Sequence, residues 1–129
     1  MSTQPKPHNP GFLALVDDAK TRVQEIDIDR YKQMVASGDP HVLVDVREDS
    51  EWDAGHVAGA VHLGKGIIER DIEKTAPDKN SKLVLYCGGG FRSALAADAL
   101  QKMGYTQAIS LDGGWRALQA SGLPLEKKG

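Results

Sequence analysis

Hydrophobic residues in this chain fall into short segments with two different spacings. The most apolar segment, Leu83–Tyr86, is nearly continuous, which is typical of a strand covered on both faces. Beyond it, apolar positions recur at helical spacing from Leu95 to Met103, and Gly104 supplies a stop signal. The pattern therefore predicts a buried strand, a glycine-containing loop and a helix.

The other elements follow from the same spacing. Strands are expected at 25–28, 41–46, 60–63 and 108–111, and helices at 31–38, 67–74 and 115–120. Asp27 or Asp29 is expected to cap the first of these helices, and Ser50 to cap a short turn that holds Glu51. Because strands and helices alternate, we expect an α/β fold with a mainly parallel five-stranded sheet and helices on both faces.

Residues 1–25 are expected to form an N-terminal arm and a helical extension. Residues 1–10 contain three prolines and predict a loose arm. Apolar residues three or four apart between Phe12 and Val23 predict an amphipathic helix that ends at about Gln24 and packs on the main domain. The main domain is expected to span residues 26–129.

Length, charge and cysteine content narrow the class of protein. A chain of 129 residues is long enough for one domain with a core. The net charge is −2 and no basic run is present, so neither a nucleic-acid partner nor an anionic membrane is indicated. No apolar stretch has membrane-spanning length, and the N-terminus lacks the apolar core of a signal peptide, which favours a cytoplasmic protein. The only cysteine cannot form an intramolecular disulfide, in agreement with a reducing compartment.

That cysteine, Cys87, lies where the predicted strand ends, at the edge of an open α/β sheet that commonly holds the functional site. The three glycines that follow let the backbone turn tightly and direct its N–H groups inward. The next helix points its positive end at the same place, while Arg92 adds a cation and Ser93 a hydroxyl. These features favour a thiolate, and the segment predicts an anion-binding loop built around a nucleophile.

Other interpretations of this loop are weaker. A buried structural cysteine is common, but it does not need three glycines and an arginine directly after it. Gly88, Gly90 and Ser93 approach the spacing of a dinucleotide-binding fingerprint, with Asp112 downstream, but the third glycine is absent. A mononucleotide-binding loop is excluded because no lysine follows the glycines.

Three segments resemble the rhodanese (sulfurtransferase) family in the family's order. The segment 87–93, Cys-Gly-Gly-Gly-Phe-Arg-Ser, is similar to its active-site loop. Val44–Glu48 followed by Glu51–Ala60 is similar to its early signature, and Leu111–Trp115 to its late one. The resemblance covers about residues 26–126 and implies a single rhodanese-like domain with thiosulfate sulfurtransferase activity.

The resemblance also implies roles for individual residues. Cys87 would be the catalytic nucleophile that carries a persulfide. The loop that would bind substrate comprises Gly88, Gly89, Gly90, Phe91, Arg92 and Ser93. Asp45 and Arg47 would support the site. Asp45 either orders the active-site loop or caps its own loop. Arg47 is expected to form a structural ion pair with Glu51, four residues on, in preference to a substrate contact.

The implied reaction needs a small sulfur donor, thiosulfate or a persulfide, and an acceptor such as cyanide, a thiol or a protein cysteine. The implied chemistry needs neither a metal nor an organic cofactor, and the scattered histidines with one cysteine indicate no metal site. Two other functions stay open. Relatives of the same fold that act on phosphate or arsenate have one residue more between cysteine and arginine than the four found here. A sulfur-carrier or binding module is the other alternative.

Overall fold

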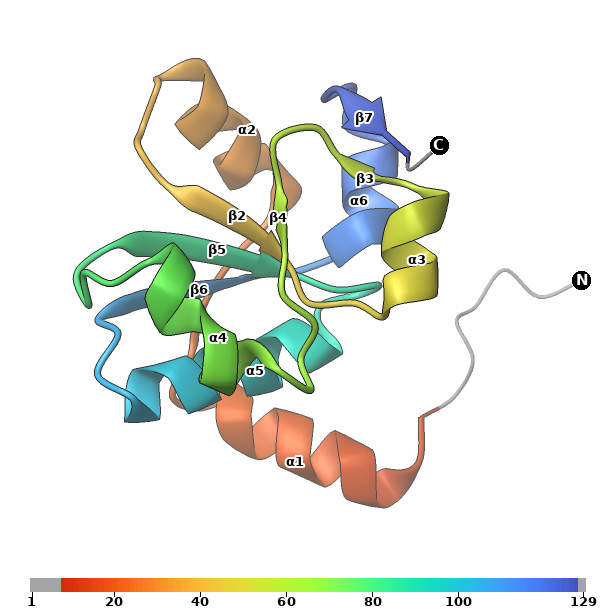
Figure 1. Ribbon diagram of the computed structural model, residues 1–129. Coiled ribbons are helices and arrows are strands. Elements are labelled where there is room, and N and C mark those ends of the chain that lie inside the picture. The colour runs from red at the N-terminus through yellow and green to blue at the C-terminus, as the bar shows by residue number, and fades with distance from the viewer. Residues whose placement is uncertain (1–7, 128–129) are drawn as a thin grey trace, which may run out of the picture.

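A parallel five-stranded sheet forms the centre of the molecule in the computed structural model, which describes residues 8–127 (Figure 1). In spatial order, its strands are Gln24–Ile26 (β1), Gln107–Leu111 (β6), Lys82–Tyr86 (β5), Val42–Asp45 (β2) and Val61–His62 (β4). Every neighbouring pair is parallel. The predicted α/β fold with a five-stranded parallel sheet is confirmed. Most of the arm predicted at residues 1–10, namely residues 1–7, lies outside the described residues.

Helices cover both faces of this sheet, as predicted (Figure 1). The helices are Pro10–Lys20 (α1), Ile28–Ala36 (α2), Asp49–Ala54 (α3), Ile68–Thr75 (α4), Phe91–Lys102 (α5) and Gly114–Gln119 (α6). Buried residues of α4 and α5 pack in one cluster, and those of α2 and α6 pack in another on the opposite face. Helix α1 lies against the outside of α5.

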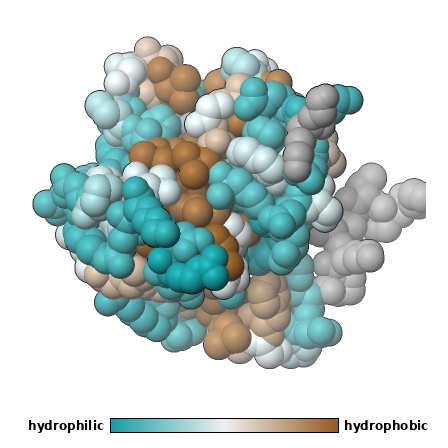
Figure 2. Space-filling view, in the orientation of Figure 1, coloured by the Kyte–Doolittle hydropathy of each residue, from teal (hydrophilic) through white to brown (hydrophobic). Residues whose placement is uncertain are grey.

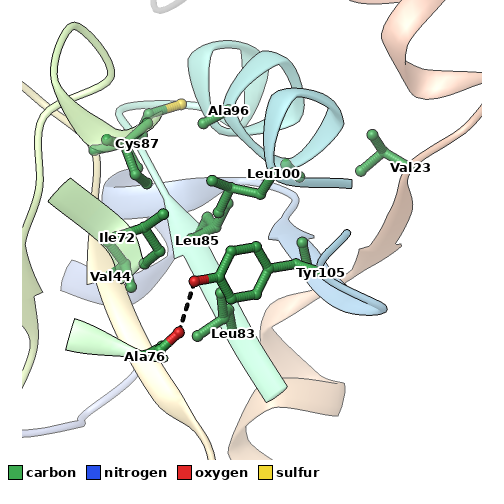
Figure 3. Packing of buried hydrophobic residues seen from close by; sticks show 14 residues of the cluster. Val23, Val44, Ile72, Ala76, Leu83, Leu85, Cys87, Ala96, Leu100 and Tyr105 are labelled. Atoms are coloured by element: carbon green, nitrogen blue, oxygen red, sulfur yellow. Dashed lines mark hydrogen bonds between the residues drawn. The ribbon is translucent and has the colours of Figure 1, made fainter. Parts of the chain in front are cut away.

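Strand β5 separates the two cores because its side chains alternate between the faces. Leu83 and Leu85 point to the α4 and α5 side, where Figure 3 shows them with Leu100, while Val84 and Tyr86 belong to the other cluster. All of these side chains are completely buried. The continuous apolar run of β5 thus reflects a central strand covered on both sides, and it places the following cysteine at the carboxyl edge.

The N-terminal helix ends earlier than its periodicity predicts. Helix α1 stops at Lys20, and Gln24, expected near the helix end, instead begins β1 and pairs with Ile109 of β6 at the sheet edge. A bidentate interaction between Arg22 and Asp98 of α5, with Nε–Oδ1 and Nη2–Oδ2 distances of 3.0 and 2.9 Å, lies at this turn. Edge pairing therefore determines where the helix stops.

Two further features differ from the sequence-based expectations. Strands His56–Val57 (β3) and Leu125–Glu126 (β7) form a small antiparallel sheet that the pattern does not predict, because two residues cannot show an alternation. The expected cap at Ser50 is wrong, since Ser50 lies inside α3 and Glu48 is the N-cap. Glu48 N donates a hydrogen bond to Glu51 Oε1 at 3.0 Å, which ties the Glu51 side chain to the start of the helix.

One exposed apolar position stands out on the surface. Figure 2 shows hydrophobic atoms at the lower edge of the molecule, where α1 lies, and Leu15 of this helix is 62% exposed. Within residues 8–127, no helix combines the length and apolar character needed to cross a membrane.

Candidate functional site

Cys87 directly follows β5, the central strand, and is 1% exposed. The next three residues carry the chain from the sheet into α5, and Gly90 is the N-cap of that helix with φ +105°, a left-handed conformation that favours glycine. The loops after the neighbouring strands β2 and β6 end at the same edge of the sheet. The cysteine therefore lies at the N-terminal, positive end of a helix of 12 residues.

The sulfur has two hydrogen-bonding neighbours. Gly90 N donates to Cys87 Sγ at 3.1 Å, and the Ser93 hydroxyl lies 3.6 Å from the sulfur. Ser93 Oγ is in turn 2.8 Å from Ser110 Oγ of β6, and both serines are completely buried. This chain of contacts fixes the Ser93 hydroxyl beside the sulfur. Sequence reasoning missed Ser110, although a polar residue inside the otherwise apolar segment Ala108–Leu111 is a signal that could have indicated it.

The outer side of the loop is fastened to the start of α6. Cys87 O accepts from Trp115 N at 2.6 Å, and Gly88 O accepts from Arg116 N at 3.2 Å. In a trans peptide the C=O and N–H groups point in opposite directions, so the Gly88 N–H points away from α6. The contact with α6 thus directs the Gly88 N–H group away from that helix.

Gly114 makes this close approach possible. Its φ is +47°, and a Cβ atom there would lie 3.0 Å from Cys87 C, 3.1 Å from Gly88 C and still closer to Cys87 O. A side chain at this position would therefore push the loop away from α6. The structure thus gives a packing reason for Gly114 within the segment Leu111–Trp115.

Arg92 forms a bidentate ion pair with Glu51 of α3, with Nη1–Oε1 and Nη2–Oε2 distances of 2.9 and 3.1 Å. The hydrogen bonds from Arg92 hold the pKa of the Glu51 carboxyl below its usual value, and the same bonds raise the pKa of Arg92. Both side chains stay about one third exposed. The cation of the loop is therefore accessible from solvent but already paired with a carboxylate.

The prediction that Arg47 forms an ion pair with Glu51 is wrong. Arg47 instead turns back onto Asp45, with an Nη2–Oδ2 distance of 2.7 Å, and Arg47 Nη2 also donates to Gly55 O. Its guanidinium lies 4.5 Å from the centre of the Trp115 ring. Asp45 and Arg47 are almost fully buried, and such a buried cation needs the nearest carboxylate, two residues away, rather than one on a helix surface.

Asp45 caps its own loop, one of the two roles expected for it. Its Oδ1 accepts from Arg47 N at 2.9 Å. The Asp45 and Arg47 pair therefore stabilises the loop that follows β2.

The remaining predicted loop residues, Gly88, Gly89 and Phe91, are half-buried around the cysteine.

Phe91 connects the loop with the N-terminal segment. Its ring centre lies 4.7 Å from that of His8 and 6.3 Å from that of Phe12, and Lys20 Nζ lies 5.1 Å from it. This contact was not predicted, because helical periodicity does not reveal which helix the apolar face will cover.

No group of three potential metal-ligating side chains occurs in the part of the chain that the structure describes.

Comparison with known proteins identifies relatives of this chain. The family model for the rhodanese-like domain matches residues 27–121. A sulfurtransferase of Allochromatium vinosum is 32% identical over 80% of this chain and 94% of its own length. The putative sulfur carrier protein YrkF of Bacillus subtilis is 31% identical over 73% of this chain, which spans only 50% of that protein.

A solved structure from Rhodopseudomonas palustris, described as a protein of unknown function and possible tyrosine phosphatase, superimposes with a TM-score of 0.79. It is 30% identical, and the match covers 95% of this chain and 99% of that one. The matches thus include a relative named as a sulfurtransferase and a structure described as a possible phosphatase. By the extent of the family match, the chain belongs to the rhodanese-like domain family.

Proposed function

We propose that this protein is a sulfurtransferase that carries a sulfane sulfur as a persulfide on Cys87. Thiosulfate or a related compound would supply the sulfur, and cyanide, a thiol or a protein cysteine would accept it. The observation that carries the proposal is the hydrogen bond from Gly90 N to Cys87 Sγ at the N-terminus of α5. A backbone donor and a helix end at the sulfur stabilise a thiolate and, after the first step, an anionic persulfide.

The reaction consists of two displacements at sulfur. In the first, the Cys87 thiolate attacks the outer sulfur of thiosulfate, an S–S bond forms, the bond to the sulfite group breaks, and sulfite leaves with the electron pair. In the second, the acceptor attacks the outer sulfur of the Cys87 persulfide and the thiolate is regenerated. The Ser93 hydroxyl, 3.6 Å from the sulfur, lies where it can donate to the sulfur in both states.

The size of the loop supports sulfur over phosphate. Four residues separate Cys87 from Arg92, and Gly90 already donates to the sulfur. The ring of N–H groups is correspondingly small and suits a single sulfur atom better than a tetrahedral oxyanion.

Mass spectrometry of the intact protein after incubation with thiosulfate tests the proposal. We expect a mass increase of one sulfur atom that cyanide removes with formation of thiocyanate. Cys87→Ser is the matched control, because the hydroxyl is similar in size but a poor nucleophile, and it is expected to lose both the adduct and the activity. Activity within about tenfold of the parent in a folded Cys87→Ser protein would exclude the proposed role of Cys87.

A phosphatase or arsenate reductase is the second candidate, favoured by the solved structure described as a possible tyrosine phosphatase. Hydrolysis of an aryl phosphate through Cys87 distinguishes the two. If the parent protein hydrolyses aryl phosphates faster than it transfers sulfur, the second candidate replaces the first.

A further inference from the structure

We propose that Glu51 selects sulfur donors by charge, so that the site favours donors with at most one negative charge over the thiosulfate dianion. Organic thiosulfonates and alkyl persulfides are the donor classes that meet this requirement. The proposal rests on the sulfurtransferase function and gives Glu51 a specificity-determining role.

The geometry of Arg92 is the first step of the argument. Both of its terminal nitrogens donate to Glu51, at 2.9 and 3.1 Å. Its Nη2 atom also lies 3.3 Å from where a Cβ atom of Gly88 would be, so the guanidinium is beside the active-site loop. An oxyanion that approaches this cation must therefore share it with a carboxylate that is already in place.

The position of Glu51 is well defined. Its Oε1 also accepts from Glu48 N at the start of α3, so the carboxylate is held by a helix end as well as by the arginine. Glu48 adds a second carboxylate that acts electrostatically on Arg92, as does the Cys87 sulfur in its anionic form. Arg92 therefore provides little uncompensated positive charge to a donor.

The charge carried by each donor gives the second step. When the Cys87 thiolate attacks thiosulfate, an anion meets a dianion and sulfite leaves as a dianion. With methanethiosulfonate the S–S bond forms in the same way, the S–SO₂ bond breaks and methanesulfinate, a monoanion, leaves. With an alkyl persulfide in its protonated form, the thiolate bonds to the terminal sulfur, the S–S bond of the persulfide breaks, an alkyl thiolate leaves and the proton stays on the transferred sulfur.

These reactions differ in how much negative charge must gather beside Arg92 and Glu51. At the short distances within the site, one additional unit charge changes the barrier by enough to alter the rate on the order of tenfold. A free arginine would offset that charge, whereas an arginine paired with Glu51 does not. The pair therefore favours the monoanionic or neutral donor.

The test measures kcat/KM for methanethiosulfonate and for thiosulfate, with cyanide as acceptor, in the full chain. We expect the parent to prefer methanethiosulfonate, and Glu51→Gln to reduce that preference on the order of tenfold, mainly through a lower KM for thiosulfate. The amide keeps an acceptor for Glu48 N. Asp53→Asn is the matched control, since it removes the same charge from the exposed side of the same helix and is expected to leave the preference unchanged.

Salt provides a second measurement that needs no variant. Raising NaCl from about 20 to about 300 mM shortens the screening length and is expected to narrow the difference between the two donors in the parent. If Glu51 had a purely structural role, Glu51→Gln would change kcat/KM for both donors by the same factor. The preference of the parent between the two donors would then not depend on salt.

The outcomes separate the two proposals. If neither donor forms a persulfide on Cys87, the sulfurtransferase function itself fails. If both donors react but the parent prefers thiosulfate, or if neither Glu51→Gln nor salt changes the preference, the role of Glu51 is overturned while the function stands.

Discussion

Substitution of Gly114 by alanine tests whether the contact between α6 and the 87–93 loop sets the position of Cys87, the proposed nucleophile. The new methyl group would lie 3.0 Å from Cys87 C and nearer still to Cys87 O. Ordinary carbon contacts are about 3.5–4.0 Å, so the loop and the helix must separate by about 1 Å. That movement stretches the hydrogen bonds from Trp115 N and Arg116 N to the loop carbonyls.

The expected loss in the free energy of unfolding of Gly114→Ala has two contributions. The left-handed conformation, φ +47°, costs alanine about 1–2 kcal/mol relative to glycine. Loss of the two hydrogen bonds adds about 1–2 kcal/mol, so Gly114→Ala is expected to lower the free energy of unfolding by about 2–4 kcal/mol. If Cys87 is the nucleophile, displacing it by about 1 Å is expected to lower kcat about 100-fold.

Gly122→Ala is the matched control. It has φ +86° and no atom within 4 Å of the new methyl group, so it carries the conformational cost without the collision. Urea unfolding gives the stabilities, and thiocyanate formation from methanethiosulfonate gives the rates. If Gly114→Ala keeps kcat within about threefold of Gly122→Ala, the contact does not position the nucleophile.

Three further predictions concern charges and loop size. Arg92→Ala leaves the Glu51 carboxylate unpaired beside the loop and is expected to slow alkylation of Cys87 by iodoacetamide at neutral pH roughly tenfold; an unchanged rate would leave the arginine a structural role only. Inserting one glycine between Gly90 and Phe91 widens the ring of amides, and it is expected to raise aryl-phosphate hydrolysis relative to sulfur transfer, whereas an unaltered ratio contradicts the argument from loop size. Hydrogen bonds from Arg22 lower the pKa of the Asp98 carboxyl below 3.8. The stability that this pair adds is therefore present above the usual carboxyl value and is lost as the pH falls through the lowered one. Asp98→Asn is expected to flatten the acid side of the stability profile, and a profile that keeps its acid side after this substitution would show that the pair contributes little.

The fold and the loop could be predicted because their signals are local. The apolar run of β5, the glycines after Cys87 and the helical spacing beyond them occur in one contiguous stretch of sequence. The same holds for the alternation of strands and helices, which determines the parallel sheet. Asp27 as the N-cap of α2 is a further local signal, and its side chain accepts from Arg30 N as such a cap should.

Contacts between distant segments could not be predicted in the same way. The spacing of Arg47 and Glu51 is compatible with a helical ion pair, but only burial shows that Arg47 must use Asp45. The true partner of Glu51 lies 41 positions away. The sequence pattern does not predict the strands β3 and β7 either, because a two-residue strand is defined by its partner strand rather than by a pattern.

Helix α1 and strand β1 pack against α5 and β6, which come much later in the chain, and this has a consequence for folding during synthesis. Arg22 and Asp98 are 76 positions apart, and β1, at the edge of the sheet, pairs with β6. Because synthesis runs from the N-terminus to the C-terminus, α1 and β1 leave the ribosome before α5 and β6, the elements that they contact. Such long-range pairing slows folding, because a large loop must close before its contacts form. Co-translational folding of this domain is accordingly expected to finish only after residue 111 has emerged, with α1 docking among the last events.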